Sequence, residues 1–383
     1  MNVFLLCLGA VTLALALTAA ILLIGGNRTI GRLSDVAPAL RAAVKVSIIV
    51  AARNEEEKIE EALLSLLSQD YPDFEIVVVD DRSTDRTAAI LDRLGRDHPC
   101  LRVIHLRELP PGWLGKNYAL YAGSEQAQGE LLLFTDADVV MEPTTLSRAV
   151  AQLQDRELDH LTLAPQAIMP NALLDLFVGA FMVFFSIYAR PWKARDPKSR
   201  AHIGIGAFNL VRREAYRAAG THRAIRMRPD DDLKLGKLIK QAGGRQDILN
   251  GRGMIRVRWY ASFAELIDGL MKNAFAVLEY SVAAVVLTSA AQLLFNVWPF
   301  AAVFVTSGPT RLLNLAVVAL IVAICFEAAR FSGNRRWLGI LFPLATLLFV
   351  YIVWRSMVVT LASGGITWRG THYKLAELRA NRI

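Results

Sequence analysis

The sequence contains little cysteine and, for its length, little charge. Three cysteines occur among 383 residues, and 20% of the residues are charged. Cys7, Cys100 and Cys325 stand singly, without the paired spacing of a metal site, so neither a disulfide framework nor a zinc site is expected. The hydrophobic fraction is 54%, above the roughly 45–50% of ordinary soluble domains. This composition excludes a disordered or fibrous protein and argues against a simple soluble enzyme.

The first apolar run, from Val3 to Ile24, is long enough to cross a bilayer as a helix, which takes about 20 residues. A signal peptide is the competing interpretation, but no basic residue precedes the run and no convincing small-residue cleavage site follows it. Four basic residues follow between Arg28 and Lys45, and basic flanks favour the cytoplasmic side. We therefore predict an N-terminal transmembrane anchor over residues 1–26 with a cytoplasmic C-terminal flank.

Three further apolar runs lie near the C-terminus, at Ser281–Ser307, Leu312–Ala329 and Trp337–Ala362. We predict a C-terminal membrane region over residues 263–383, with about three spans and a basic tail. The basic turn at 330–336 is expected in the cytoplasm. Three crossings would place the tail outside, whereas its basic residues favour the inside, so the side of the tail stays open.

Another apolar run, Ala172–Ala189, carries Asp175 and lies between Pro170 and Pro191. A span at this place would divide the hydrophilic middle of the chain between two compartments. We therefore predict an interfacial helix at 172–189, because a basic stretch that can bind anionic lipid follows it. An ordinary buried core helix remains the alternative.

The hydrophilic middle alternates short apolar runs with amphipathic segments. The expected strands are Val46–Val50, Phe74–Val79, Leu101–Leu106 and Leu131–Phe134, and the expected helices are Glu55–Ser68 and Thr87–Gly95. The run at 74–79 is nearly all apolar, as a parallel strand buried on both faces should be. The alternation predicts an α/β domain with a parallel, nucleotide-binding type of sheet over residues 44–262.

Acidic pairs follow two of these strands. Asp80 and Asp81 follow one strand, and Asp136 and Asp138 follow another. Ligands of open α/β sheets bind at the carboxyl ends of the strands. Two carboxylates at such an edge suit a hard divalent cation whose shell is completed by water and diphosphate oxygens. A turn or a helix N-cap is the alternative for any single pair, and it is the expected role of Asp85.

Two further segments carry candidate residues. Asp230, Asp231 and Asp232 open an amphipathic helix, where the helix dipole favours acids, but three in succession exceed what capping requires. One of them could serve as a general base. The turn-rich loop before Lys116 lets this lysine reach a phosphate, although it is not a Walker loop, because Asn117 stands where Ser or Thr is required.

Five motifs, taken together and in order, resemble those of family 2 glycosyltransferases. The matching segments are Val46–Glu56, Val79–Asp85, Gly115–Leu120, Thr135–Asp138 and Asp231–Gly236. In the last of these, Asp231 replaces a glutamate of the family, and the resemblance covers residues 44–260. The flanking apolar runs resemble the membrane-bound lipid-acceptor branch, which includes ceramide-glucosyltransferase-like, hopanoid-associated and carotenoid-associated enzymes. The tail segment Trp368–Tyr373 resembles the same branch, less specifically.

The resemblance implies an A-type glycosyltransferase fold with N- and C-terminal transmembrane helices, and inverting, metal-dependent transfer of a sugar from a nucleotide sugar to a lipid or isoprenoid. Asp81 would recognise the base of the nucleotide. Asp136 and Asp138 would bind Mg²⁺ or Mn²⁺, with Asp138 the better ligand. Asp232 would be the catalytic base, with Asp231 the other candidate. By residue matching, the donor-binding side chains are Ala52, Asn54, Glu55, Asp80, Asp81, Lys116 and Asp136.

One departure concerns the Gln-x-x-Arg-Trp motif of the processive, cellulose-synthase-like members. Here Arg256–Trp259 lacks the glutamine and falls on a strand-like segment, and the expected helix contains Gly269–Asn273 instead. The departure argues against polymer synthesis and favours non-processive transfer. It also leaves only the metal, Lys116 and Lys272 as cations for the leaving diphosphate.

The expected partners are a nucleotide-sugar donor, with a UDP-sugar as the first expectation, a lipid acceptor and the membrane, without nucleic acid. The expected location is the cell inner membrane, as a multi-pass protein whose catalytic domain is cytoplasmic. Polysaccharide synthesis and a non-catalytic scaffold with a transferase-like domain remain alternatives. A transporter is disfavoured, because two of the C-terminal runs contain at most Glu327, near an end. The sequence identifies neither the sugar nor the acceptor.

Overall fold

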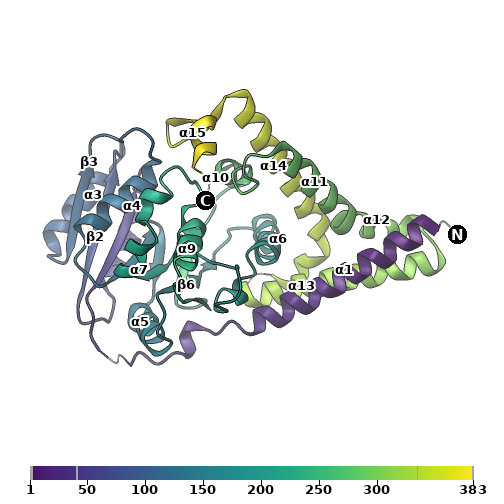
Figure 1. Ribbon diagram of the computed structural model, residues 1–383, viewed down its shortest axis with the longest axis horizontal. Helices are drawn as coiled ribbons and strands as arrows, with labels where there is room; N and C mark the ends of the chain where they lie inside the picture. Colours follow the sequence, from purple (N-terminus) through teal and green to yellow (C-terminus); the bar gives the residue numbers. More distant parts are fainter. Residues whose placement is uncertain (1–2, 40–41, 334, 382–383) are drawn as a thin grey trace. The chain divides into compact units, whose positions relative to one another are not determined.

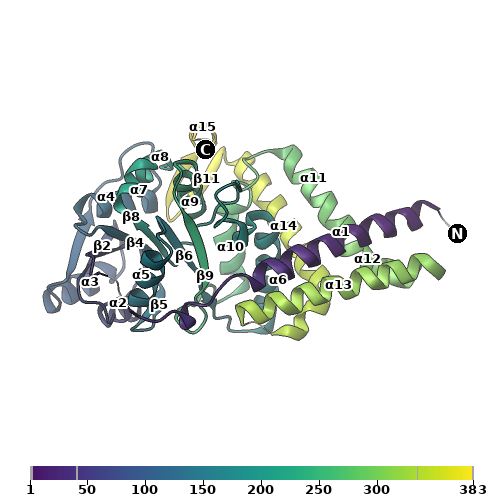
Figure 2. The same cartoon turned by 60° about the horizontal axis from the view of Figure 1, so that its bottom comes forward.

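Two compact units make up the chain (Figures 1 and 2). The computed structural model describes residues 3–39, 42–333 and 335–381. The helical unit comprises Met1–Thr29, Met169–Arg190 and Trp259–Ile366, and the sheet unit comprises Ile30–Ile168, Pro191–Arg258 and Thr367–Ile383. The chain passes between the units several times, so neither unit is one continuous segment.

The sheet unit is built on a seven-stranded sheet in the order β3-β2-β1-β4-β8-β6-β9. Its strands are β1 (Val46–Ala52), β2 (Phe74–Asp81), β3 (Leu101–Leu106), β4 (Leu131–Asp136), β6 (His160–Ala164), β8 (Asn209–Arg212) and β9 (Gln246–Asn250). The four strands expected from the sequence are present, and each pairs with its neighbour in parallel. A smaller sheet has the order β5-β10-β7, and β11 pairs with β12. These strands are β5 (Val139–Met141), β7 (Gln166–Ala167), β10 (Ile255–Val257), β11 (Gly365–Trp368) and β12 (Thr371–Lys374).

The sequence predicts a parallel sheet, but the complete sheet is mixed, because β8 runs antiparallel to both β4 and β6. Parallel neighbours are normally joined by a crossover helix that packs on the same sheet. The chain between β6 and β8 instead passes through α6 (Ala172–Ala189), which belongs to the helical unit. The rule that predicts parallel neighbours therefore does not apply to this connection.

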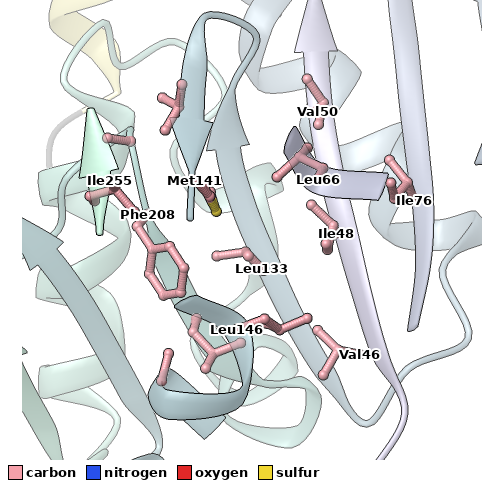
Figure 3. Packing of buried hydrophobic residues seen from close by; sticks show 14 of the residues in the cluster. Val46, Ile48, Val50, Leu66, Ile76, Leu133, Met141, Leu146, Phe208 and Ile255 are labelled. Atoms are coloured by element: carbon pink, nitrogen blue, oxygen red, sulfur yellow. The ribbon is translucent and has the colours of Figure 1, made fainter. Parts of the chain in front are cut away.

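Helices cover both faces of the large sheet. On β1, Ile48 and Val50 pack with residues of α2, α3 and α5, whereas Ile49 packs with residues of α4, α7 and α9. This alternation follows from the two-residue period of a strand. Figure 3 shows the first cluster, in which Ile48 lies near Leu133 and Leu66. The helices of the unit are α2 (Ile59–Leu67), α3 (Thr87–Asp97), α4 (Gly115–Gln126), α5 (Thr145–Asp155), α7 (Arg213–Ala218), α8 (Thr221–Ala224), α9 (Asp231–Gln241) and α15 (Leu375–Ala380), with short 3₁₀ turns η1 (Leu33–Asp35) and η2 (Pro191–Lys193).

Helix α2 begins later than the sequence predicts. The prediction starts at Glu55, but the helix starts at Ile59. The backbone N–H of Glu55 donates to Thr87 Oγ1 at 2.8 Å, and that of Lys58 donates to the Glu55 carbonyl at 3.0 Å. The residues before α2 therefore form a turn that is tied to the start of α3, at the edge of the sheet where the candidate site lies.

The helical unit contains the apolar runs of the sequence. Five helices of the described chain are long and apolar enough to cross a membrane: Val3–Arg28, Ala172–Lys193, Val282–Val305, Gly308–Ser332 and Trp337–Ala362. The prediction of an interfacial location for the second one stays a prediction. The elements of this unit are α1 (Val3–Arg28), α6, α10 (Phe263–Ala274), α11 (Val282–Gln292), η3 (Leu293–Val297), α12 (Trp298–Val305), α13 (Gly308–Ser332), η4 (Arg336–Leu341) and α14 (Phe342–Ala362).

Aromatic and polar contacts join these helices to one another. Phe177 of α6 stacks on Phe349 of α14, with ring centroids 4.2 Å apart. Trp354 Nε1 of α14 donates to Ser289 Oγ of α11 at 2.9 Å. Packing and interhelical hydrogen bonds of this kind are what hold helices together in lipid.

The α2 helix offers a test of the fold. Leu63 is fully buried, whereas Leu64, the next residue, is 46% exposed. Leu63→Ala should cost about 2–5 kcal/mol, because it removes buried methyl groups and leaves a cavity. Leu64→Ala is the matched control and should cost less than about 0.5 kcal/mol. The thermal unfolding midpoint of the purified full-length protein in detergent measures both, and equal shifts would contradict the register of this helix.

Candidate active site

The register of the parallel strands brings the predicted residues to one edge of the sheet. Ala52 at the end of β1 pairs with Asp80 of β2, and Ala51 pairs with Asp136 of β4. Carboxyl ends of parallel strands meet at the same edge. The two acidic strand ends that the sequence indicated are therefore next-nearest neighbours across β1.

Lys116 lies among the carboxylates at this edge. Its Nζ is 2.8 Å from Asp136 Oδ1 and 3.5 Å from Asp231 Oδ2. Burial opposes the charged amine, but the charges of Asp136, Asp231 and Asp232 outweigh it and raise the pKa of Lys116. The lysine is therefore protonated at neutral pH, and its charge offsets that of the acids around it.

Asp232 is held by the backbone of two segments. Its Oδ2 accepts from the Gly206 N–H at 2.7 Å, and its Oδ1 accepts from the Leu233 N–H at 2.8 Å. Burial, and then the negative charge of Asp231, raise the pKa of Asp232 to about 7. A carboxyl group with this pKa can take up a proton at neutral pH.

Two glycines make the approach to Asp232 possible, and the sequence analysis did not identify them. A β-carbon on Gly204 would overlap the backbone carbonyl of Asp232. One on Gly206 would lie 2.6 Å from Asp136 Oδ2. The Gly-x-Gly spacing before β8 was the available signal, because such spacing marks a close approach of backbone to another group.

Asp138 lies at the end of β4 beside Asp136. Lys58 Nζ is 3.4 Å from Asp138 Oδ2. Burial, and then the charge of Asp136, raise the pKa of Asp138 to about 6, and Glu55 is close enough to contribute. These carboxylates are crowded, and a cation bound between them would relieve their repulsion.

The two aspartates fit Mg²⁺ or Mn²⁺ as a pair of oxygen ligands. Among the described residues, no group of three or more His, Cys, Asp or Glu is arranged to hold a metal ion. A site with two carboxylates suits an ion that keeps several waters and takes further oxygens from a substrate phosphate. Asp136 is 38% exposed and Asp138 is 21% exposed, so both can be reached by such an ion.

Asp80 and Asp81 already have protein partners. Asp81 is 2.7 Å from Arg82 Nε and 3.4 Å from Arg53 NH1. Asp80 accepts from the Ser83 N–H at 3.2 Å and lies 2.9 Å from His105 Nδ1. The hydrogen bond to Asp80 raises the pKa of His105. Recognition of a nucleotide base by Asp81 stays a prediction. It would require a carboxylate oxygen of Asp81 to leave Arg82 or Arg53 and accept a hydrogen bond from the base.

The loop after β1 is fixed by hydrogen bonds to the loop after β2. Asn54 has a left-handed backbone (φ 53°), and its Oδ1 accepts from the Thr84 N–H at 2.8 Å. Its own N–H donates to Ser83 Oγ at 3.0 Å. Ala52 is 1% exposed and packs in the core. The donor-binding roles of Ala52, Asn54 and Glu55 stay predictions.

The three acids before and in α9 have different roles. Asp230 binds the fully buried Arg228, with Nε–Oδ1 at 2.9 Å and NH2–Oδ2 at 3.0 Å. Asn117 Nδ2 donates to the Arg228 carbonyl at 2.9 Å and so connects α4 to the same loop. Asp230 is therefore structural, and Asp231 and Asp232 are the two that lie near Lys116. Lys272, the other cation named from the sequence, lies on α10 in the helical unit.

Comparisons with known proteins found a matching family model and similar proteins. Residues 47–220 match the family model described as Glycosyl transferase family 2. A 4,4'-diaponeurosporenoate glycosyltransferase of Staphylococcus haemolyticus (strain JCSC1435) is 25% identical over 233 residues, and the match spans 60% of this chain and 60% of the length of that relative. A protein of the same description from Staphylococcus aureus (strain MRSA252) is 24% identical over 352 residues, or 87% of this chain and 89% of that relative.

A solved structure shows the same fold. It is the mannosyltransferase PcManGT from Pyrobaculum calidifontis in complex with GDP-Man and Mn²⁺. The TM-score is 0.58 at 21% identity, and the alignment covers 90% of this chain and 98% of that chain. The expectation of an A-type glycosyltransferase fold is thereby confirmed. The chain therefore has the fold of an A-type glycosyltransferase, and its residues 47–220 match glycosyl transferase family 2.

Proposed function

We propose that this protein transfers a sugar from a nucleotide sugar to a membrane lipid or isoprenoid, by inverting, metal-dependent and non-processive catalysis. The observation that carries the proposal is the cluster of Asp136, Asp231 and Asp232 around Lys116 at the carboxyl edge of the sheet. It combines candidate metal ligands, a cation and a carboxyl group whose pKa lies near 7.

Asp136 and Asp138 hold Mg²⁺ or Mn²⁺ in this proposal. The ion supplies Lewis-acid stabilisation of the charge that develops on the leaving diphosphate. The relative PcManGT was solved with Mn²⁺ and GDP-Man, which supports a divalent ion and a nucleoside diphosphate donor here. Lys116 adds a positive charge at the same edge, and the Asn54–Glu55 loop and Asp81 line the place of the nucleoside.

Asp232 acts as the general base. The acceptor hydroxyl oxygen forms a bond to the anomeric carbon while the bond from that carbon to the diphosphate oxygen breaks, and the hydroxyl proton passes to Asp232 Oδ. One displacement of this kind inverts the anomeric centre. The N–H groups of Gly206 and Leu233 hold the carboxylate in position.

The acceptor is proposed from the apolar helices and the relatives. Within the part of the chain that the structure describes, five helices are long and apolar enough to cross a membrane. The two relatives reported above carry the name 4,4'-diaponeurosporenoate glycosyltransferase, which supports an isoprenoid acceptor. The incomplete Gln-x-x-Arg-Trp motif at Arg256–Trp259 favours one transfer per binding event. We propose the cell inner membrane as location, with the sheet unit in the cytoplasm, where nucleotide sugars are made.

Asp138→Asn tests metal dependence. The change removes a charged oxygen ligand, so binding of GDP or UDP in the presence of Mn²⁺ should weaken by at least about 100-fold, more than the loss of an outer-shell partner costs. Isothermal titration calorimetry with the detergent-purified protein measures it. Asp73→Asn, at an exposed position of the same unit, is the control and should bind as the wild type does. Wild-type affinity in Asp138→Asn would reject the metal assignment.

Asp232→Asn tests the base. Turnover should fall by about 10²–10⁴-fold while donor affinity changes little, and the wild-type rate should fall as the pH drops below about 7. Sugar transfer to extracted lipids, followed from pH 5 to 9, measures both effects. If Asp231→Asn abolishes turnover and Asp232→Asn does not, the two roles are exchanged.

The same variant separates a catalytic from a structural role through stability. The pKa of Asp232 is higher in the folded protein than in the unfolded chain, where it is near 4. Its protonation therefore stabilises the fold below that unfolded pKa, and this contribution is lost as the pH rises through about 7. Asp232→Asn should therefore not lower the thermal midpoint at pH 8. Asp230→Asn is the structural contrast and should lower it, because it leaves the buried Arg228 without its carboxylate partner.

Chemical labelling of Cys100 tests on which side of the membrane the sheet unit lies. It is exposed in the sheet unit. In a Cys7→Ser, Cys325→Ser background, a membrane-impermeant maleimide should label Cys100 only after spheroplasts are opened. Labelling of intact spheroplasts would place the sheet unit on the other side.

A further inference from the structure

The segment after β11 belongs to the sheet unit, and it contains an arginine with an unfavourable backbone conformation. Arg369 and Gly370 lie between β11 and β12 with φ of 47° and 78°. Two successive left-handed residues are typical of a type I′ hairpin turn, in which Asn, Asp or Gly is preferred at the first position. A long side chain at this position is unfavourable, and such positions are concentrated at functional sites.

The guanidinium of Arg369 lies at the predicted donor edge. It donates to the backbone carbonyl of Arg53 and to Glu55 Oε1, the latter at 2.5 Å. Glu55 is in turn close enough to Asp138 to raise its pKa. The arginine is thus one residue removed from a candidate metal ligand, and its side chain is still 39% exposed.

The same segment is anchored beside Lys116. Tyr373 is buried, and its hydroxyl accepts from the Gly115 N–H, at the first residue of α4, at 3.3 Å. Gly115 in turn leaves no room for a side chain, because a β-carbon there would overlap Asp81 Oδ2. Asn381 Oδ1 accepts from the Met227 N–H at 3.0 Å, and its Nδ2 donates to the Ala224 carbonyl at 2.9 Å. The contacts of Tyr373 and Asn381 therefore hold the segment against the rest of the sheet unit, with Tyr373 beside the start of α4.

The other cations at this edge pair with acids at the strand ends, and their side chains are 18–29% exposed. Lys116 is neutralised by Asp136 and Asp231, and Arg53 and Arg82 share Asp81. Arg369 pairs with the Glu55 carboxylate, and its side chain is more exposed than theirs, at 39%. Its planar guanidinium presents several N–H donors, which match phosphate oxygens in pairs.

We propose that Arg369 binds the diphosphate of the nucleotide donor, and that the C-terminal segment Thr367–Asn381 is therefore a component of the donor site. This inference rests on the proposed function. It supplies the cation that the incomplete Gln-x-x-Arg-Trp motif leaves missing. Arg369 keeps or exchanges its contact with Glu55 when the diphosphate binds beside it.

Equilibrium binding of GDP, UDP and the matching nucleosides to the full-length protein with Mn²⁺ tests the proposal. Arg369→Gln should weaken binding of the nucleoside diphosphates at least about tenfold, because charge-assisted hydrogen bonds are lost. Nucleoside affinity and the thermal midpoint without ligand should stay unchanged. Arg369→Lys should retain part of the affinity. Arg96→Gln, at an exposed position of α3, is the matched control and should bind as the wild type does.

Two results would overturn the inference. One is wild-type affinity for nucleoside diphosphates in Arg369→Gln. The other is an equal loss of nucleoside and diphosphate binding together with a lower thermal midpoint, which would mean that the ion pair with Glu55 only holds the loop. Failure of the proposed function differs from both, because the wild type itself would then bind no nucleoside diphosphate and transfer no sugar.

Discussion

Carboxylates that gather at the ends of neighbouring parallel strands repel one another unless a cation lies between them. Lys116 meets this constraint, because its Nζ lies within ion-pair distance of Asp136 and Asp231. Its position depends on the start of α4 at Gly115, where only a glycine fits against Asp81. The proposed chemistry needs the same cluster, since a divalent ion and a diphosphate bring additional charges of both signs to it.

The acids at the sheet edge divide into two groups by their partners. Asp80 lies against His105, and Asp230 binds the buried Arg228, so these carboxylates are fixed by neighbouring protein groups. Asp138 and Asp232 also have protein partners, but burial and nearby like charges disfavour their ionised forms and raise their pKa values. Raised pKa values of this origin are typical of functional sites. The division supports assigning metal binding and proton transfer to the second group.

The sequence predicted much of the sheet and the meeting of acidic residues at its edge, for identifiable reasons. Apolar runs and helical spacing located β1 to β4, and the acids that follow β2 and β4 meet at one edge because parallel strands align there. The antiparallel β8 was not predictable, because the chain leaves the sheet unit through α6 before it. The contacts of Gly204 and Gly206 with α9 and β4, and the placement of Arg369 near Glu55, depend on segments far apart in the chain. The Gly-x-Gly spacing marks a close approach, but no local pattern identifies the distant groups that make these contacts.

The central claim is that the carboxyl edge of the sheet binds a divalent ion together with a nucleoside diphosphate. Anomalous X-ray diffraction from crystals of the full-length protein grown with Mn²⁺ and GDP or UDP locates the ion directly. The account predicts one Mn²⁺ peak about 2.0–2.3 Å from a carboxylate oxygen of Asp138, with diphosphate oxygens in the same coordination shell. A nucleotide bound at this edge without such a peak, or a Mn²⁺ peak away from both Asp136 and Asp138, would contradict it.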